Sequence, residues 1–99
     1  VEVMPEFIGG TAALMKYLSS NIKYPTISQE TGSQGKVIVQ FVVDKDGTIS
    51  NPEVVRGVDP YLDKEAIRVI SSMPKWTPGV QNGKKVRVKF TVPVSFRLQ

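Results

Sequence analysis

The fold is decided by residues 35–47, which read GKVIVQFVVDKDG. The stretch is rich in β-branched and aromatic residues and ends in a tight turn, where Gly47 supplies the positive φ that such turns require. Val37, Val39, Phe41 and Val43 fall on one face and Ile38, Gln40 and Val42 on the other, so both faces carry apolar residues. This pattern predicts a central strand that is covered at least in part on both sides.

Upstream of this strand the chain predicts one helix and one short turn. Residues 1–10 read as irregular, with Phe7 anchoring them onto the rest of the chain. From Thr11 to about Asn21 the apolar residues repeat every four positions, as Leu14, Leu18 and Ile22, with Met15 beside them. That spacing predicts an amphipathic helix, which ends before Tyr24-Pro25 because the residue before proline avoids helical geometry. A loop or a single helical turn follows over residues 26–34, with Gly32 as its stop.

Downstream, a weaker return strand runs from Thr48 to about Arg56, and Pro52 predicts that it is bent or peripheral. A second helix begins with Asp59 as its cap and Pro60 in its first turn. Its core-facing residues are Leu62, Ala66, Val69, Ile70 and Met73. Pro74 stops the helix, residues 76–79 form a loop in which Trp76 plugs the core, and residues 81–84 form a second tight turn.

The C-terminal run has the cleanest alternation in the chain. Val86, Val88, Phe90, Val92, Val94, Phe96 and Leu98 alternate with polar residues and Pro93. Proline inside so regular a strand predicts an edge position, where its missing N–H points away from the neighbouring strand. We therefore predict an α+β fold: a three-stranded antiparallel sheet in the order 2-1-3, with two helices packed on one face.

Composition limits the functions that the chain can have. Its 99 residues predict one domain with one modest core, and its formal charge of +4 is mild. Because it has neither Cys nor His, a thiolate nucleophile, a disulfide, a His-ligated metal site and a Ser-His-Asp triad are all excluded within it. No apolar run is long enough to span a bilayer. The chain begins at Val1 without Met, from which we expect a fragment of a longer protein.

Several signals have a structural interpretation that we favour over a functional one. Asp44 and Asp46 lack the further acidic ligands of a calcium loop and fit a turn. Asp63 and Glu65 suit the positive end of a helix dipole better than a catalytic carboxylate pair. A basic stripe without exposed aromatic residues predicts a solvated strand face and no nucleic acid; it consists of Lys84, Lys85, Arg87, Lys89 and Arg97. A weak contact with acidic groups stays open.

In order and spacing, the chain resembles the TonB C-terminal domain family. The resemblance covers nearly the whole chain and rests on PEF at 5–7 with Gly9-Gly10, YP at 24–25, residues 35–47, VVRG at 54–57, residues 59–66, residues 73–79 and NGK at 82–84. Two positions depart from the family pattern: Ile8 replaces a frequent Pro, and Ser28 replaces a small apolar residue. Neither departure touches the last strand.

The resemblance implies a periplasmic module, tethered to the inner membrane by a helix and a Pro-rich linker that this chain lacks. It implies partners too: outer-membrane receptors, whose short extended "box" is added beside the last strand, and an inner-membrane proton-channel complex. It implies no cofactor or metal. Carried onto this sequence, the receptor-peptide site consists of Gln29, Arg87, Lys89, Phe90, Thr91, Val92, Pro93, Val94, Ser95 and Phe96.

Three alternatives remain beside this interpretation. The open edge of the last strand is, on its own, only an edge, and Arg87, Lys89 and Pro93 are common devices against aggregation. A second copy of the chain pairing at that edge would give a homodimer. The same domain also fits a sensor or accessory module of a membrane peptidase or signalling protein. An enzyme acting alone is the least favoured, because no nucleophile–base pair can be assembled.

Overall fold

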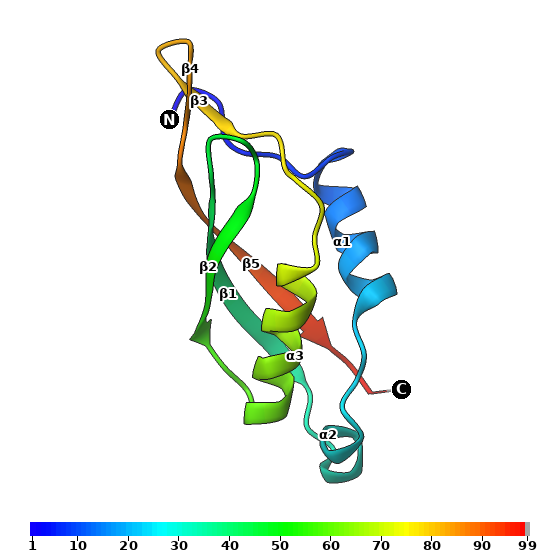
Figure 1. The fold of residues 1–99 in the computed structure, drawn as a ribbon. Coiled ribbons are helices and arrows are strands. Elements are labelled where there is room, and N and C mark those ends of the chain that lie inside the picture. Colours follow the sequence, from blue (N-terminus) through cyan, green and yellow to red (C-terminus); the bar gives the residue numbers. More distant parts are fainter. Residues whose placement is uncertain (99) are drawn as a thin grey trace.

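A three-stranded antiparallel sheet lies at the centre of the computed structural model, which describes residues 1–98 (Figure 1). Its strands are β1 (Gly35–Val43), β2 (Ile49–Arg56) and β5 (Val88–Phe96), in the order β2-β1-β5. The predicted fold class and strand order are confirmed. The molecule is elongated, with extents of 50 × 22 × 18 Å.

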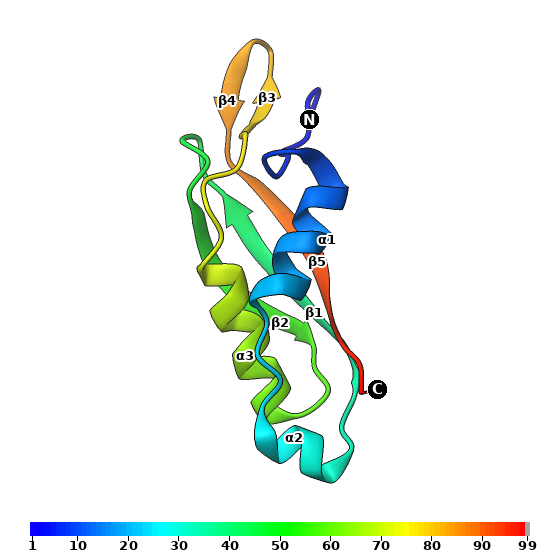
Figure 2. The same ribbon diagram turned by 90° about the vertical axis from the view of Figure 1, so that its right-hand side faces the viewer.

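Both long helices, α1 (Gly10–Asn21) and α3 (Pro60–Ser71), lie on the same face of this sheet (Figure 2). The start of α3 follows the sequence signal, since the Asp59 carboxylate accepts the Leu62 N–H at 2.7 Å and Pro60 occupies the first turn. The predicted short turn is a one-and-a-half-turn helix, α2 (Thr26–Thr31), and it ends at Gly32 with a φ of 73°. None of the helices in residues 1–98 is long and apolar enough to cross a membrane.

The core lies between the sheet and these two helices. Its fully buried side chains include Val37, Val39, Phe41 and Val43 of β1 and Leu62, Ala66, Val69 and Ile70 of α3. Trp76 plugs one end, as predicted, and packs edge-on against Phe41 with ring centroids 5.3 Å apart. On the opposite face of β1, Ile38 and Val42 are half-buried, so that face is covered in part, as expected, although both long helices pack on the other face.

The expected C-terminal strand is interrupted near its start. Its first residue, Val86, belongs to a small hairpin of β3 (Gly79–Gln81) and β4 (Lys84–Val86), which pair with each other around the predicted tight turn at Asn82 and Gly83. The chain leaves this hairpin at Arg87, whose guanidinium pairs with Asp44 at 2.8 Å, and only then enters β5. The alternation of side chains continues across this break, which is why periodicity alone does not reveal it.

Two isolated β-bridges tie the N-terminal segment to the chain that follows Trp76. Val3 pairs with Val80 and Glu6 pairs with Thr77, so the segment runs antiparallel along the edge of β3 (Figure 1). Phe7 follows as a buried anchor against Trp76 and Tyr17, with centroid distances of 5.8 and 5.6 Å. The anchoring role of Phe7 is confirmed, and apart from the two isolated bridges residues 1–9 form no helix or strand.

Candidate functional site

The candidate site is the edge of β5 that faces away from β1. On its inner side β5 pairs with β1 over nine consecutive residue pairs, from Gly35–Phe96 to Val43–Val88. On its outer side, none of the strands in the described part of the chain pairs with it. An unpaired strand edge presents a row of main-chain donors and acceptors to solvent, and an extended peptide can use them.

Pro93 shows which main-chain groups face outward. Its pairing with Ile38 is part of an unbroken ladder, although proline has no N–H to donate. The ladder can continue through this pair only if Pro93 sits at a non-hydrogen-bonded position relative to β1. Its neighbours two residues away share that orientation, so the N–H groups of Lys89, Thr91 and Ser95 point toward the open edge. The main-chain N–H and C=O groups of the even-numbered residues point toward β1 and form the ladder.

The side chains of β5 divide between the two faces as predicted. Lys89, Thr91, Pro93 and Ser95 are exposed, Phe90 is half-buried, and Val92, Val94 and Phe96 lie in the core. Phe90 and Phe96 lie on the helix-covered face of β5, so neither ring forms an exposed stacking platform beside the basic stripe. Arg87, which we placed in the site, lies outside β5 and is held by Asp44.

Gln29 lies on α2, beyond the C-terminal end of β5. Its side-chain amide donates to the carbonyl of Tyr24 at 3.0 Å. The Tyr24 ring packs edge-on against Phe96, with centroids 5.6 Å apart, and its hydroxyl donates to the carbonyl of Ser33. Desolvation, with a smaller contribution from the Asp59 charge, raises the pKa of Tyr24. The structure thus brings Gln29 to the same end of the sheet as Phe96, through Tyr24.

A groove beside β5 is the feature that sequence reasoning missed. It lies between β5 and the chain segment that enters α1, and its walls include Glu6, Phe7, Met15, Phe90 and Val92. Met15 is 39% exposed, although its place beside the Leu14–Leu18 stripe suggested core. An apolar residue beside the Leu14–Leu18 stripe was the signal available in the sequence, but the position of the groove depends on the angle at which α1 crosses β5.

The acidic residues of α3 have structural roles, as the sequence favoured. Asp63 accepts the N–H of Val58 at 3.0 Å. Glu65 accepts two hydrogen bonds from Arg68, each 2.7 Å long, and the N–H of Lys23 at 2.6 Å. Burial acts to raise the pKa of Glu65, but these hydrogen bonds and the Arg68 charge outweigh it and lower that pKa.

The two carboxylates of the 44–47 turn are also engaged. Asp44 pairs with Arg87, and Asp46 accepts the N–H of Thr48 at 2.9 Å. Hydrogen bonds from Thr48 lower the pKa of Asp46. Both groups therefore stabilise the turn, in agreement with the interpretation that we favoured over a calcium loop.

Comparison with known proteins gives the family to which the chain belongs. Residues 20–98 match the family described as "Gram-negative bacterial TonB protein C-terminal". The chain belongs to the TonB C-terminal family. The match includes β1, β2, α3 and all of β5, so it contains the candidate site; α1 is largely outside it.

Two curated proteins named Protein TonB are similar to this TonB C-terminal chain. That of Haemophilus influenzae is 33% identical over 85 residues, which is 82% of this chain and 32% of that protein. That of Helicobacter pylori is 26% identical over 83 residues, which is 83% of this chain and 28% of that protein. The chain thus spans about a third of the length of these relatives.

Solved structures of the Helicobacter pylori TonB C-terminal domain share the fold. The NMR structure of its residues 194–285 has a TM-score of 0.66 and 24% identity, covering 87% of this chain and 90% of that one. A longer form, residues 179–285, has a TM-score of 0.57 and 25% identity, with coverages of 85% and 78%. The sheet and helices described above are therefore an arrangement found in TonB C-terminal domains.

Proposed function

We propose that this chain is the periplasmic receptor-binding module of a TonB-type energy transducer. It accepts the short extended box of an outer-membrane receptor as an added strand beside β5. A preceding segment tethers it to the inner membrane, where a proton-channel complex supplies the energy for import. The module binds and transmits force; it catalyses no reaction and holds no cofactor.

The observation that carries this proposal is the orientation of the free groups on β5, in a chain of the TonB family. The N–H groups of Lys89, Thr91 and Ser95 face outward, and the carbonyl of Pro93 joins them. The proposed site is the backbone of residues 89–96, with Gln29 near its C-terminal end and Arg87 before its first residue. Main-chain pairing tolerates varied side chains, so one module can serve several receptors.

The energetics suit a grip that must be released. Each main-chain hydrogen bond contributes only about 0.5–1.5 kcal/mol net, so a few of them give specific but reversible binding. The side chains of Lys89 and Arg97 make this edge basic, and Lys36 lies on the adjacent strand. Acidic side chains on the solvent face of the guest strand would complement these cations.

Titration with the box peptide of a receptor from the same bacterium tests the proposal. We expect amide shifts concentrated on β5. Thr91→Pro removes one outward N–H without touching the ladder to β1, so it should weaken binding by about 3- to 10-fold. Thr91→Ala keeps the N–H and should stay within about twofold of the unsubstituted chain, given that it loses no main-chain bond.

Two results would overturn the proposal. One is the absence of any shift on β5 at saturating concentrations of every such box peptide. The other is equal binding by Thr91→Pro and Thr91→Ala, which would show that the outward main-chain groups of β5 do not hold the peptide.

A further inference from the structure

The groove beside β5 lies where a guest strand would project its side chains. Figure 2 shows α1 crossing in front of β5 on the helix-covered side of the sheet. The groove opens between them at Thr91, Val92 and Pro93, and most of its lining is apolar. Among its lining residues only Glu6 carries a charge. The open edge of β5 and the groove are therefore one continuous surface.

Strand geometry determines which guest side chains enter the groove. An added strand lies about 4.8 Å from β5, and paired residues point to the same face of a sheet. Guest residues opposite Lys89, Thr91 and Pro93 point to solvent. Guest residues opposite Phe90 and Val92 point to the helix side and meet the groove, at non-hydrogen-bonded pairs where facing side chains come closest. The lining fits an apolar side chain at those positions.

One wall of the groove belongs to residues 1–7, which we call the N-terminal strap. Val3 and Val80 exchange two main-chain hydrogen bonds of 3.0 and 2.9 Å, and Glu6 and Thr77 exchange two of 3.0 and 2.8 Å. Gly79 permits this close approach, since a Cβ there would lie 3.1 Å from the Val3 carbonyl oxygen and 3.3 Å from Pro5 Cδ. These contacts hold the strap in place as the wall.

We propose that the N-terminal strap is part of the receptor-binding site, and that docking of the strap on β3 is coupled to binding of the receptor peptide. The inference rests on the proposed function, because the guest is the same receptor peptide. The docked strap holds Glu6 and Phe7 against the apolar side chain of the guest, and a bound guest in turn holds the strap on β3. By linkage, each event strengthens the other by the same factor.

The coupling gives the strap a role under load. In the proposed transducer the tether lies on the N-terminal side of the strap, so tension reaches the pairs at Val3 and Glu6 before it reaches the sheet. Peeling these pairs removes the wall and lowers the affinity for the guest. The strap therefore makes the grip sensitive to force applied along the tether.

Substitutions at Thr77, which pairs with the strap but does not line the groove, test the coupling in the 99-residue chain. Thr77→Pro removes the N–H that bonds the Glu6 carbonyl, whereas Thr77→Ala keeps both main-chain bonds to Glu6. With the same box peptide, we expect Thr77→Pro to weaken binding by about fivefold or more and Thr77→Ala by about twofold at most. The coupling is overturned if Thr77→Ala weakens binding as much as Thr77→Pro, or if Thr77→Pro binds like the unsubstituted chain.

Hydrogen exchange on the unsubstituted chain gives a second readout that does not depend on how a variant folds. Saturating peptide should slow amide exchange at Val3, Glu6, Thr77 and Val80. If the peptide shifts β5 but leaves these four amides unchanged, the coupling is wrong and the proposed function stands. If the peptide does not bind the unsubstituted chain at all, the proposed function fails, and the coupling fails with it.

Discussion

At the scale of single residues, Ser28 shows how a polar group is accommodated in the core. Its side chain is fully buried, and its hydroxyl donates to the Asp59 carboxylate at 3.0 and 3.3 Å. The same carboxylate caps α3 through the Leu62 N–H. Burial acts to raise the pKa of Asp59, but hydrogen bonds from Leu62, Ser33 and Ser28 prevail and lower it. Ser28 thus ties α2 to the first turn of α3.

Replacing Ser28 by Ala should therefore cost stability. The change removes a buried donor and leaves the Asp59 carboxylate with one hydrogen bond fewer, for which we expect a loss of about 1–2 kcal/mol. Urea denaturation of Ser28→Ala measures the difference. Ser20→Ala, at an exposed position of α1, is the control and should change stability by less than about 0.5 kcal/mol. Equal midpoints for the two variants would contradict this role for Ser28.

Comparing Gly47 with Gly32 distinguishes the cost of a left-handed backbone from the cost of a steric clash. Both have left-handed φ values, 89° and 73°, but a Cβ at Gly47 would collide with the Trp76 carbonyl, whereas a Cβ at Gly32 would meet nothing within 4 Å. Gly32→Ala should cost about 1–2 kcal/mol, the strain of a left-handed residue. Gly47→Ala should cost clearly more, because it also displaces the hydrogen bond from Trp76 N to Gly47 O. Similar losses in thermal unfolding would show that space at Gly47 is not limiting.

At the scale of residues, the sequence predicted correctly those features that depend on residues close by in the chain. The Asp59 cap, Pro60 in the first turn of α3 and the glycine at position 47 each depend on neighbours within a few positions. Ser28 and Asp59 are distant in the chain, and so are Arg87 and Asp44; such pairs depend on how the helices and strands pack. Sequence reasoning therefore missed the reason for Ser28 and the tie that takes Arg87 away from β5.

At the scale of secondary-structure elements, the alternation of apolar residues predicted the faces of β5 and its edge position correctly. Pro93 carried most of that inference, because a proline is tolerated only where its missing N–H faces outward. The same alternation failed to separate β4 from β5. Side chains keep their period across Arg87 while the pairing partner changes from β3 to β1, and partners are not visible in a pattern of period two.

Pro93 also limits pairing at the open edge of β5, because it has no N–H to donate there. Replacing Pro93 should therefore strengthen pairing at this edge. Pro93→Thr adds one outward N–H between those of Thr91 and Ser95. We expect the affinity for the box peptide to rise by about 2- to 10-fold, the contribution of one main-chain hydrogen bond. Sedimentation should also show whether the variant pairs with itself, since Pro blunts strand edges against self-association. Pro93→Ala is a second donor-restoring variant, and a Thr-only effect would indicate that the side chain matters instead.

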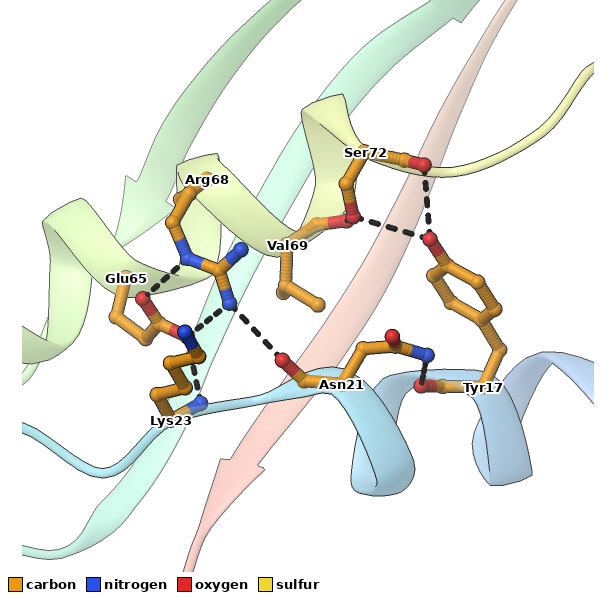
Figure 3. A network of polar contacts seen from close by, with 7 residues as sticks. All are labelled: Tyr17, Asn21, Lys23, Glu65, Arg68, Val69 and Ser72. Carbon is orange, nitrogen blue, oxygen red and sulfur yellow. Dashed lines mark hydrogen bonds and ion pairs between the residues drawn. The ribbon is translucent and has the colours of Figure 1, made fainter.

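At the scale of the whole molecule, the position of α1 depends on a polar network that joins it to α3 (Figure 3). The Tyr17 hydroxyl donates to the Ser72 carbonyl at 2.8 Å, and Arg68 donates to the Asn21 carbonyl at 2.9 Å. Glu65 holds Arg68 and the N–H of Lys23, at the exit from α1. This network secures α1 on α3, and α1 in turn borders the groove beside β5. Neither the network nor the groove follows from periodicity, because both depend on the packing of α1.

The network and the Asp59 cap together predict that acid destabilises the molecule. Hydrogen bonds lower the pKa of Asp59 and Glu65 in the folded state despite their burial. Groups with a lowered folded pKa contribute stability that is complete above their ordinary values near 4 and is lost as pH falls through the folded values. The free energy of unfolding should therefore stay level from pH 7 to about 5 and decline below about 4.

Glu65→Gln and Asp59→Asn, the latter keeping an efficient helix cap, should each remove part of that decline. Urea unfolding at a series of pH values measures this decline. If the profiles of both variants run parallel to that of the unsubstituted chain, other carboxylates control the acid transition.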